Sequence, residues 1–223
     1  MLAKPKPFPL PPRLARSPLV QNPLTVLAVN WLCQGLRGMG RRERRARLAA
    51  EASLVLLLWP ALVPAAGTGG GLLLALLLAH TLQWTLNGQF WVVMRYLPGW
   101  HRDPAAVVAF RRALEARLRA ASWLREAVIT GSLVRRAEGA GPHSDIDVRL
   151  VYPPRAAARL RADLLALALR ARAFLRAIPL DLYLEDRVED LARLDPRDPW
   201  RLVVDRDGRI RRHFAGRRRM EGA

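Results

Sequence analysis

Two aspartates in the second half of the chain have the type and spacing of a carboxylate site. Asp145 and Asp147 lie two apart in the segment 144–151, where polar and apolar residues alternate. Successive side chains of a strand point to opposite faces, so the two carboxylates are expected to share one face. The opposite, core-facing side of this strand would then carry Ile146, Val148 and Leu150.

Two carboxylates at this spacing repel each other, and without a partner the pKa of one of them rises. A divalent cation removes the conflict, and carboxylate oxygens suit hard ions such as Mg²⁺ or Mn²⁺. Asp181 lies in a third strand candidate, Pro179–Leu184, and can add a third carboxylate from a neighbouring strand. The alternative is that the acids are exposed on a solvated strand face.

A second feature precedes these acids. The apolar, β-branched segment Ala127–Thr130 is a strand candidate that ends at Gly131 and Ser132. Glycine lets backbone N–H groups approach a phosphate closely, and the serine hydroxyl adds a donor. Phosphate-binding donors beside three carboxylates predict a two-metal phosphoryl-transfer site.

In order and spacing, these residues resemble the polymerase-beta-like nucleotidyltransferase superfamily, and in particular its small stand-alone domains. The family pattern is a strand ending in Gly-Ser, a short helix, a loop, Asp-hydrophobic-Asp and a third Asp on a later strand. This chain matches with Gly131-Ser132, Asp145-Ile146-Asp147 and Asp181, and it keeps the family's arginine at Arg135.

The resemblance implies an α/β (α+β) nucleotidyltransferase fold over residues 98–215, with a mixed sheet and flanking helices. It implies an enzyme that transfers a nucleoside monophosphate from a nucleoside triphosphate, such as ATP, to an acceptor. By resemblance, Asp145, Asp147 and Asp181 are the catalytic residues and hold Mg²⁺ or Mn²⁺. Gly131, Ser132 and Arg135 bind the triphosphate.

The domain is preceded by a block without Asp, Glu, Lys or Arg, residues 52–94. This length allows two membrane crossings of about 20 residues each. The uncharged turn Ala65–Gly71 divides it, so we expect an apolar helical hairpin over 48–97. A soluble, buried helical pair is the alternative.

Arginines flank the block on both outer sides, in Arg41–Arg47 before it and at Arg95 and Arg102 after it. Because the turn carries none, the positive-inside rule places both termini and the catalytic domain in the cytoplasm, with the hairpin in the inner (cytoplasmic) membrane.

The second limb carries a polar face formed by His80, Gln83 and Asn87, with Gln89 close behind. In a bilayer such a face must meet another helix or water. It can contact a lipid-linked substrate or a partner membrane protein. The favoured interpretation is hydrogen bonding to the first limb or to a second copy.

Residues 1–47 read as a flexible proline-rich arm, an amphipathic helix over 24–36 and the basic run Arg41–Arg47. The basic run is expected to attract anionic lipid, and its alternative is a solvated basic face. After the hairpin, the sequence predicts further helices over 103–125, with Asp103 as N-cap, 155–177 and 186–194. A β-hairpin is expected over 200–213 and a disordered basic tail over 216–223.

The charge composition narrows the classes of partner that the protein is expected to bind. Lys+Arg 37 against Asp+Glu 19 gives a net charge of +18, which favours an anionic partner: nucleic acid, anionic lipid or nucleotide. A nucleic-acid-binding role is less favoured, because the core lacks a stretch of interleaved aromatic and basic residues. A non-catalytic nucleotide-binding or interaction module with the same fold stays open. The acceptor and the base preference are left open as well.

Overall fold

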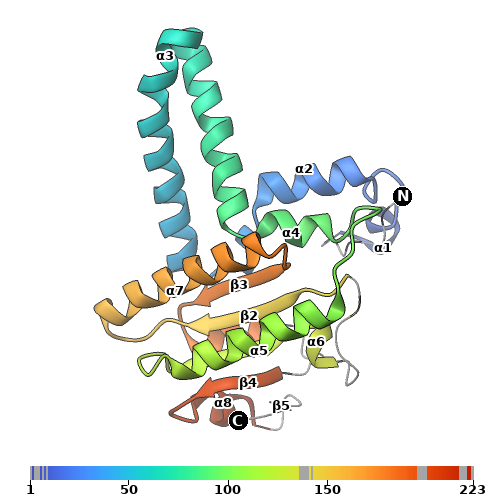
Figure 1. The fold of residues 1–223 in the computed structure, drawn as a ribbon, viewed down its shortest axis with the longest axis vertical. Helices are drawn as coiled ribbons and strands as arrows, with labels where there is room; N and C mark the ends of the chain where they lie inside the picture. The colour runs from blue at the N-terminus through green and yellow to red at the C-terminus, as the bar shows by residue number, and fades with distance from the viewer. Residues whose placement is uncertain are drawn as a thin grey trace.

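The structure is a computed structural model that describes residues 2, 6, 8, 10–135, 141, 143–194, 200–215 and 220–221. It is an α+β protein in which a mixed sheet is flanked by helices and a long helical hairpin projects away from the sheet (Figure 1). The strands are β1 (Glu126–Thr130), β2 (Ile146–Val151), β3 (Leu180–Glu185), β4 (Trp200–Asp205) and β5 (Met220–Glu221). The helices are α1 (Pro12–Ala15), α2 (Pro23–Cys33), η1 (Leu36–Gly38), α3 (Arg41–Leu86), α4 (Gln89–Met94), α5 (Pro104–Ala120), α6 (Ser132–Arg135), α7 (Ala156–Leu175), η2 (Val188–Arg193) and α8 (Arg209–Phe214).

The sheet has the strand order β3-β2-β1-β4-β5. Strand β1 is antiparallel to both β2 and β4, whereas β2 and β3 are parallel and joined through α7. Reversal between β1 and β2 puts the end of β1 beside the start of β2, and the parallel pair puts the start of β3 there as well. Three segments that are far apart in sequence therefore meet at one end of the sheet.

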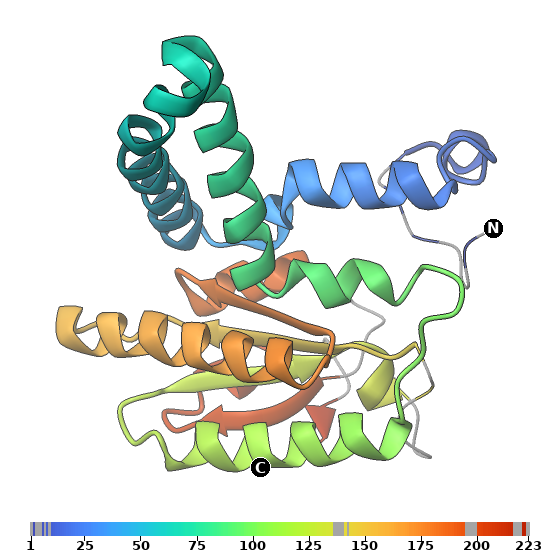
Figure 2. The ribbon, with the colours of Figure 1, turned by 45° about the horizontal axis from the view of Figure 1, so that its top comes forward.

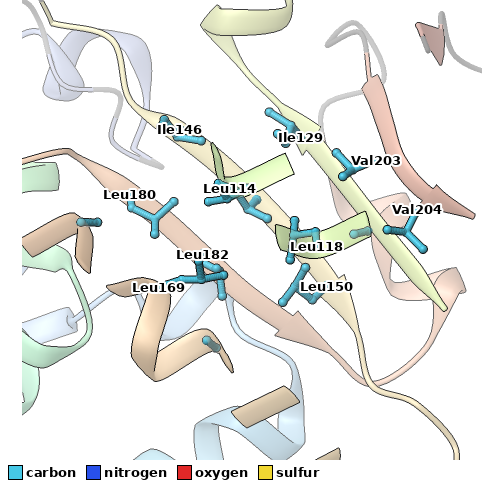
Figure 3. Close-up of a cluster of buried hydrophobic side chains, with 14 of the residues drawn as sticks. Leu114, Leu118, Ile129, Ile146, Leu150, Leu169, Leu180, Leu182, Val203 and Val204 are labelled. Carbon is cyan, nitrogen blue, oxygen red and sulfur yellow. The ribbon is translucent and has the colours of Figure 1, made fainter. Parts of the chain in front are cut away.

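Helices α5 and α7 cover one face of the sheet and form the main core (Figure 3). The expected inward residues of β2, Ile146, Val148 and Leu150, are fully buried there, so the predicted core face is confirmed, although the other face of β2 is largely buried too. A second cluster on the other face packs η2 and α8 against Trp200 and Leu202 of β4. The side chain of Asp103 caps α5 by accepting from Ala105 N at 2.9 Å, as expected.

The apolar block forms the hairpin. Helix α3 runs through Pro60 and Pro64 and is interrupted by the non-helical backbone of Gly67 (φ 69°, ψ 172°), inside the predicted turn. Judged by length and composition alone, α3 is long enough and apolar enough to cross a membrane. Leucines project from both limbs into the surroundings: Leu48, Leu56, Leu57, Leu72, Leu73, Leu74, Leu76, Leu77, Leu78, Leu82 and Leu86.

The two limbs of α3 approach each other through small residues. A Cβ built on Gly71 would lie 3.0–3.2 Å from backbone atoms of Leu62 and Val63. The indole N–H of Trp59 donates to the carbonyl of Thr68 across the turn at 3.1 Å. Close backbone approach at small residues is typical of helices that pack in lipid, where dispersion replaces the hydrophobic effect.

The polar side chains on the second limb form hydrogen bonds with other groups of the protein. One ring nitrogen of His80 lies 2.7 Å from Glu51 Oε1 of the first limb, and the other lies 2.9 Å from the Trp31 carbonyl. Gln83 donates to the Arg47 carbonyl at 2.9 Å, and Asn87 donates to Gln83 Oε1 at 3.3 Å. This face therefore holds the hairpin together and ties it to α2, in agreement with the favoured interpretation.

Several expected boundaries differ from the structure. The prediction of a C-terminal β-hairpin is wrong for its second strand, because residues 209–214 form the helix α8 after Gly208 (φ 63°). Asp205 accepts from the N–H groups of Ile210 and Arg211, which starts a helix in place of a returning strand. Within the expected disordered tail, residues 220–221 pair with β4, and residues 216–219 and 222–223 lie outside the described part.

The basic run also differs from a uniformly solvated face. It belongs to α3 from Arg41 onward, and Arg47 turns inward to pair with the buried Glu43. Arg44 and Arg45 stay exposed. The predicted helix 24–36 ends earlier, at Cys33, because Gln34 and Gly35 take positive φ values of 45° and 71°. The predicted helix from Asp103 to about Arg125 likewise ends at Ala120.

Candidate functional site: a carboxylate cluster closed by an arginine

The three aspartates gather at the sheet end where β1 finishes and β2 and β3 begin. Asp145 immediately precedes β2, and Asp147 and Asp181 are paired residues of the parallel strands β2 and β3. Thr130, the last residue of β1, is the antiparallel partner of Asp147. The strand pairing therefore brings Asp147 and Asp181 side by side.

Gly131 lies directly against this cluster. Its backbone has φ +85°, which side chains of L residues rarely adopt, and a Cβ at this position would collide with Asp147 Oδ2. Ser132 and Arg135 lie on α6, the turn of helix that follows, but the positions of their side chains are outside the described part. Between them Leu133 and Val134 are buried in the main core.

A buried arginine lies among the carboxylates. The guanidinium of Arg95, just after α4, forms an ion pair with Asp145 through Nη1 and donates from Nη2 to Tyr96 Oη at 2.9 Å. Its Nε donates to the Val92 carbonyl at 3.1 Å, which fixes the side chain. Although burial lowers the pKa of Arg95, Asp145, Tyr96 and the other two aspartates raise it above its ordinary value.

Asp147 is an acid whose pKa is strongly perturbed by its surroundings. Burial, together with the neighbouring charges of Asp145 and Asp181, raises its pKa well above the ordinary value, while Arg95 and Arg149 act in the opposite direction. A carboxyl group in this condition gains from any additional positive charge near it. Perturbation by burial and like charge is typical of functional sites, although structural ion pairs can cause it too.

Asp181 is oriented from the helical half of the molecule. Gln89 at the start of α4 donates from Nε2 to Asp181 Oδ1 at 3.1 Å and to Tyr183 Oη at 3.3 Å. Its own Oε1 accepts from Asn30 at 3.3 Å, and Asn30 Oδ1 accepts from the Trp84 indole at 2.7 Å. A chain of hydrogen bonds thus connects α2 and α3 to the third carboxylate.

Chemically, the site offers oxygen ligands of the kind that Mg²⁺ and Mn²⁺ prefer. In the described residues, however, no three His, Cys, Asp or Glu side chains converge closely enough to hold a metal ion. Arg95 supplies a positive charge to the cluster through its ion pair with Asp145. The donor chemistry fits a hard divalent cation, and binding one requires that it compete with this guanidinium.

Arg95 and Gln89 are functional candidates that sequence reasoning missed. The sequence identifies Arg95 only as a charge flanking the apolar block, and Gln89 only as a polar residue that follows the polar face. The signal in each case was polarity at the end of a long apolar segment, where Gln89 and Arg95 bracket a six-residue helix. Their position beside the aspartates depends on the turn around Gly88 (φ 78°), which sequence spacing does not reveal.

Comparison with known proteins adds no family. No family model matches the chain, and neither a curated protein nor a solved structure matches it.

Proposed function

We propose that this protein is a membrane-tethered, metal-dependent nucleotidyltransferase. It transfers a nucleoside monophosphate from a nucleoside triphosphate to an acceptor, from the cytoplasmic side of the inner membrane. The observation that carries the proposal is the meeting of Asp145, Asp147 and Asp181 with Gly131 at one end of the mixed sheet.

The arrangement of elements supports this proposal. A mixed sheet with flanking helices, in the order α5-β1-α6-β2-α7-β3, supports it. Gly131 leaves room for the backbone and the nucleotide phosphates to approach Asp147, which a side chain would block. Ser132 and Arg135 follow at the start and end of α6, where they would bind the triphosphate.

Each group in the site has a distinct task in this reaction. Asp145, Asp147 and Asp181 would hold the divalent cation, which neutralises charge on the departing pyrophosphate when bound. Gln89 orients Asp181 through its hydrogen bond. Arg95 holds the carboxylates together when no cation neutralises them and is placed to contact an anionic substrate once released from Asp145.

The membrane part of the proposal rests on α3. Its exposed leucines, its length and the flanking arginines support a hairpin that crosses the bilayer twice and keeps both termini in the cytoplasm. Arg44 and Arg45, exposed at the base of the hairpin, would contact anionic lipid head groups.

The test is label transfer by the full-length protein in lipid nanodiscs, with nucleoside triphosphates labelled at the α-phosphate and a membrane lipid extract as acceptor source. Asp147→Asn and Asp181→Asn should each lower Mg²⁺-dependent transfer on the order of a hundredfold or more, because the carboxylates act as one site. Asp103→Asn is the matched control, since it loses the same charge outside the site and asparagine caps a helix equally well. Full activity in the two site variants would show that the site is misassigned.

One observation favours a second candidate, a non-catalytic module that keeps the fold. The ion pair between Arg95 and Asp145 already supplies a positive charge at the place where a cation would bind. If the wild-type protein transfers no label from any nucleotide and is not stabilised by Mn²⁺ with nucleotide, this candidate replaces the enzyme.

A further inference from the structure

A pocket of about 340 Å³ lies between the N-terminal arm and α2. Apolar side chains from both sides form most of its wall, and its size is at the lower end of small-molecule sites, which span about 300–1,000 Å³. The apolar wall residues are Phe8, Leu10, Val20, Val29 and Leu36. Its polar groups include Lys6 and Asn30.

Lys6 is held in place through its backbone. Its N–H donates to Gln21 Oε1 at 2.9 Å, and its carbonyl accepts from Gln21 Nε2 at 2.9 Å. Its ammonium lies 5.0 Å from the centre of the Tyr96 ring. Burial and, to a smaller extent, the charge of Arg95 lower the pKa of Lys6 to about 8, while Asp181 opposes the shift.

Two contact routes join the pocket to the carboxylate cluster. The first runs from Asn30 through Gln89 to Asp181. The second runs from Lys6 over Tyr96, whose hydroxyl accepts from Arg95, to Asp145. The pocket is therefore linked to the cluster through intervening side chains, and the Lys6 ammonium lies within electrostatic reach of Asp181.

The pocket also lies at the base of the hairpin. Figures 1 and 2 show α2 leaving this base across the direction of the hairpin rather than along it. The Trp31 indole donates to Thr81 Oγ1 at 3.2 Å, and Gln34 donates to the His80 carbonyl at 2.8 Å, which fixes α2 there. If the hairpin spans the bilayer, α2 runs along the membrane surface with Leu24 and Leu32 exposed.

We infer that this pocket holds the apolar chain of an amphiphilic acceptor whose phosphate head group lies against the Lys6 ammonium, beside Asp181. The inference rests on the proposed function and specifies its acceptor as a membrane lipid that bears a phosphate monoester. The apolar wall recognises the chain, and an ammonium is a common protein partner of phosphate. The position of α2 lets the lipid enter from the membrane surface.

The chemistry balances without a further reactant. An oxygen of the acceptor phosphate attacks the α-phosphorus of the nucleoside triphosphate, and the bond from this phosphorus to the pyrophosphate oxygen breaks. The products are a nucleoside diphosphate ester of the lipid alcohol and pyrophosphate. The attacking oxygen of the phosphate dianion carries no proton, so the step requires no general base.

Cys33 provides a binding assay that is independent of transfer. It is the only cysteine of the chain, it lines the pocket and its thiol is free and exposed. We would measure its alkylation by N-ethylmaleimide in the full-length protein in neutral-lipid nanodiscs. Octyl phosphate at ten times its dissociation constant should slow the reaction about tenfold, since about a tenth of the sites stay free. Inorganic phosphate should give no protection at the same concentration.

Two variants test the two halves of the site. Lys6→Gln should lose most of the protection by octyl phosphate but keep the weaker protection by octanol, because only the head-group contact is removed. The matched control is Arg13→Gln, which removes the same charge from an exposed position on α1. Val29→Trp should fill the pocket, slow alkylation without ligand and abolish further protection.

Three results would overturn the inference: no protection by octyl phosphate, equal protection by octyl phosphate in wild type and Lys6→Gln, or protection by inorganic phosphate alone. These outcomes are separable from failure of the proposed function. Label transfer that persists without octyl phosphate binding leaves the enzyme intact and rejects the pocket. Binding without any transfer keeps the pocket and rejects the enzyme.

Discussion

At the scale of single residues, the decisive feature of the site is a cation supplied by the protein itself. Arg95 is buried, is fixed by Val92 and Tyr96, and pairs with Asp145. A buried charge is stable only with a partner, and Arg95 supplies that partner to Asp145. The Arg95 guanidinium and a divalent metal ion would therefore compete for the same carboxylates.

Replacing Arg95 should shift this balance. We expect Arg95→Gln to lower the melting temperature of the metal-free protein, because Asp145 loses its buried partner. Mn²⁺ should then bind on the order of tenfold more tightly than to wild type, since it no longer competes with a guanidinium. Calorimetric titration with Mn²⁺ measures this, with Arg112→Gln on the exposed side of α5 as control. Unchanged or weaker Mn²⁺ binding would contradict the competition.

Glu185, at the end of β3, predicts a pH dependence of stability. Burial raises its pKa from 4.5 to about 7, although Arg149 and Arg193 lower it. Between these two pKa values the folded protein keeps the Glu185 proton that the unfolded chain releases. The protonated carboxyl therefore contributes its full stabilisation below about pH 4.5, and this stabilisation is lost by about pH 7. The loss is at most about 3 kcal/mol in free energy of unfolding.

The measurement compares melting temperatures at pH 5 and pH 8. Wild type should lose more stability over this interval than Glu185→Gln, which cannot ionise. Glu189→Gln, an exposed neighbour on η2, should behave as wild type. A parallel decline in all three proteins would exclude Glu185 as the source.

At the scale of elements, a buried ionic cluster joins the hairpin to the sheet. Glu43 on the first turn of α3 accepts from Arg47 Nη2 at 2.6 Å, from Arg170 of α7 and from the backbone N–H of Leu184 at 2.7 Å. Arg170 also donates to the Leu182 carbonyl at 2.6 Å. One carboxylate thus connects three elements, including the strand that carries Asp181.

We expect Glu43→Ala to cost about 3–5 kcal/mol in free energy of unfolding, because Arg47 and Arg170 would remain buried without their shared partner. Denaturant unfolding in detergent, followed by near-ultraviolet circular dichroism, gives this value. Glu189→Ala, on the surface, should change it by less than about 0.5 kcal/mol. Adding Arg170→Met to Glu43→Ala should recover part of the loss, and a further additive loss would argue against a shared cluster.

At the scale of the whole molecule, the proposed membrane hairpin leads us to expect one orientation of the chain relative to the membrane. Activity reporters fused at Gly69 and at the C-terminus should lie on opposite sides of the membrane, since arginines flank only the outer ends of the block. Placing three arginines in the 65–71 turn is the matched perturbation and should lower the fraction with this orientation. Reporters on the same side, or a protein that is soluble without detergent, would contradict the prediction that the hairpin spans the membrane.

The sequence predicted the elements whose signals are local. Alternation placed Asp147 on a strand with Ile146 inward, and the charge-free block located the hairpin and its turn. It did not predict Arg95 beside Asp145, because that contact depends on how α4 folds back onto β3 after Gly88. It also failed at residues 209–214, where a turn sequence suited to a β-hairpin is followed by a helix capped by Asp205.

The position of Glu43 has a consequence for modularity. The hairpin is not interchangeable with an unrelated one, because its first turn supplies a side chain to the interior of the sheet domain. A chimera that keeps residues 98–215 and receives an unrelated apolar hairpin would leave Arg170 without its carboxylate partner Glu43. Recombination within this chain would therefore preserve the sheet domain only when the boundary lies before Gly40, so that hairpin and sheet are inherited as one unit.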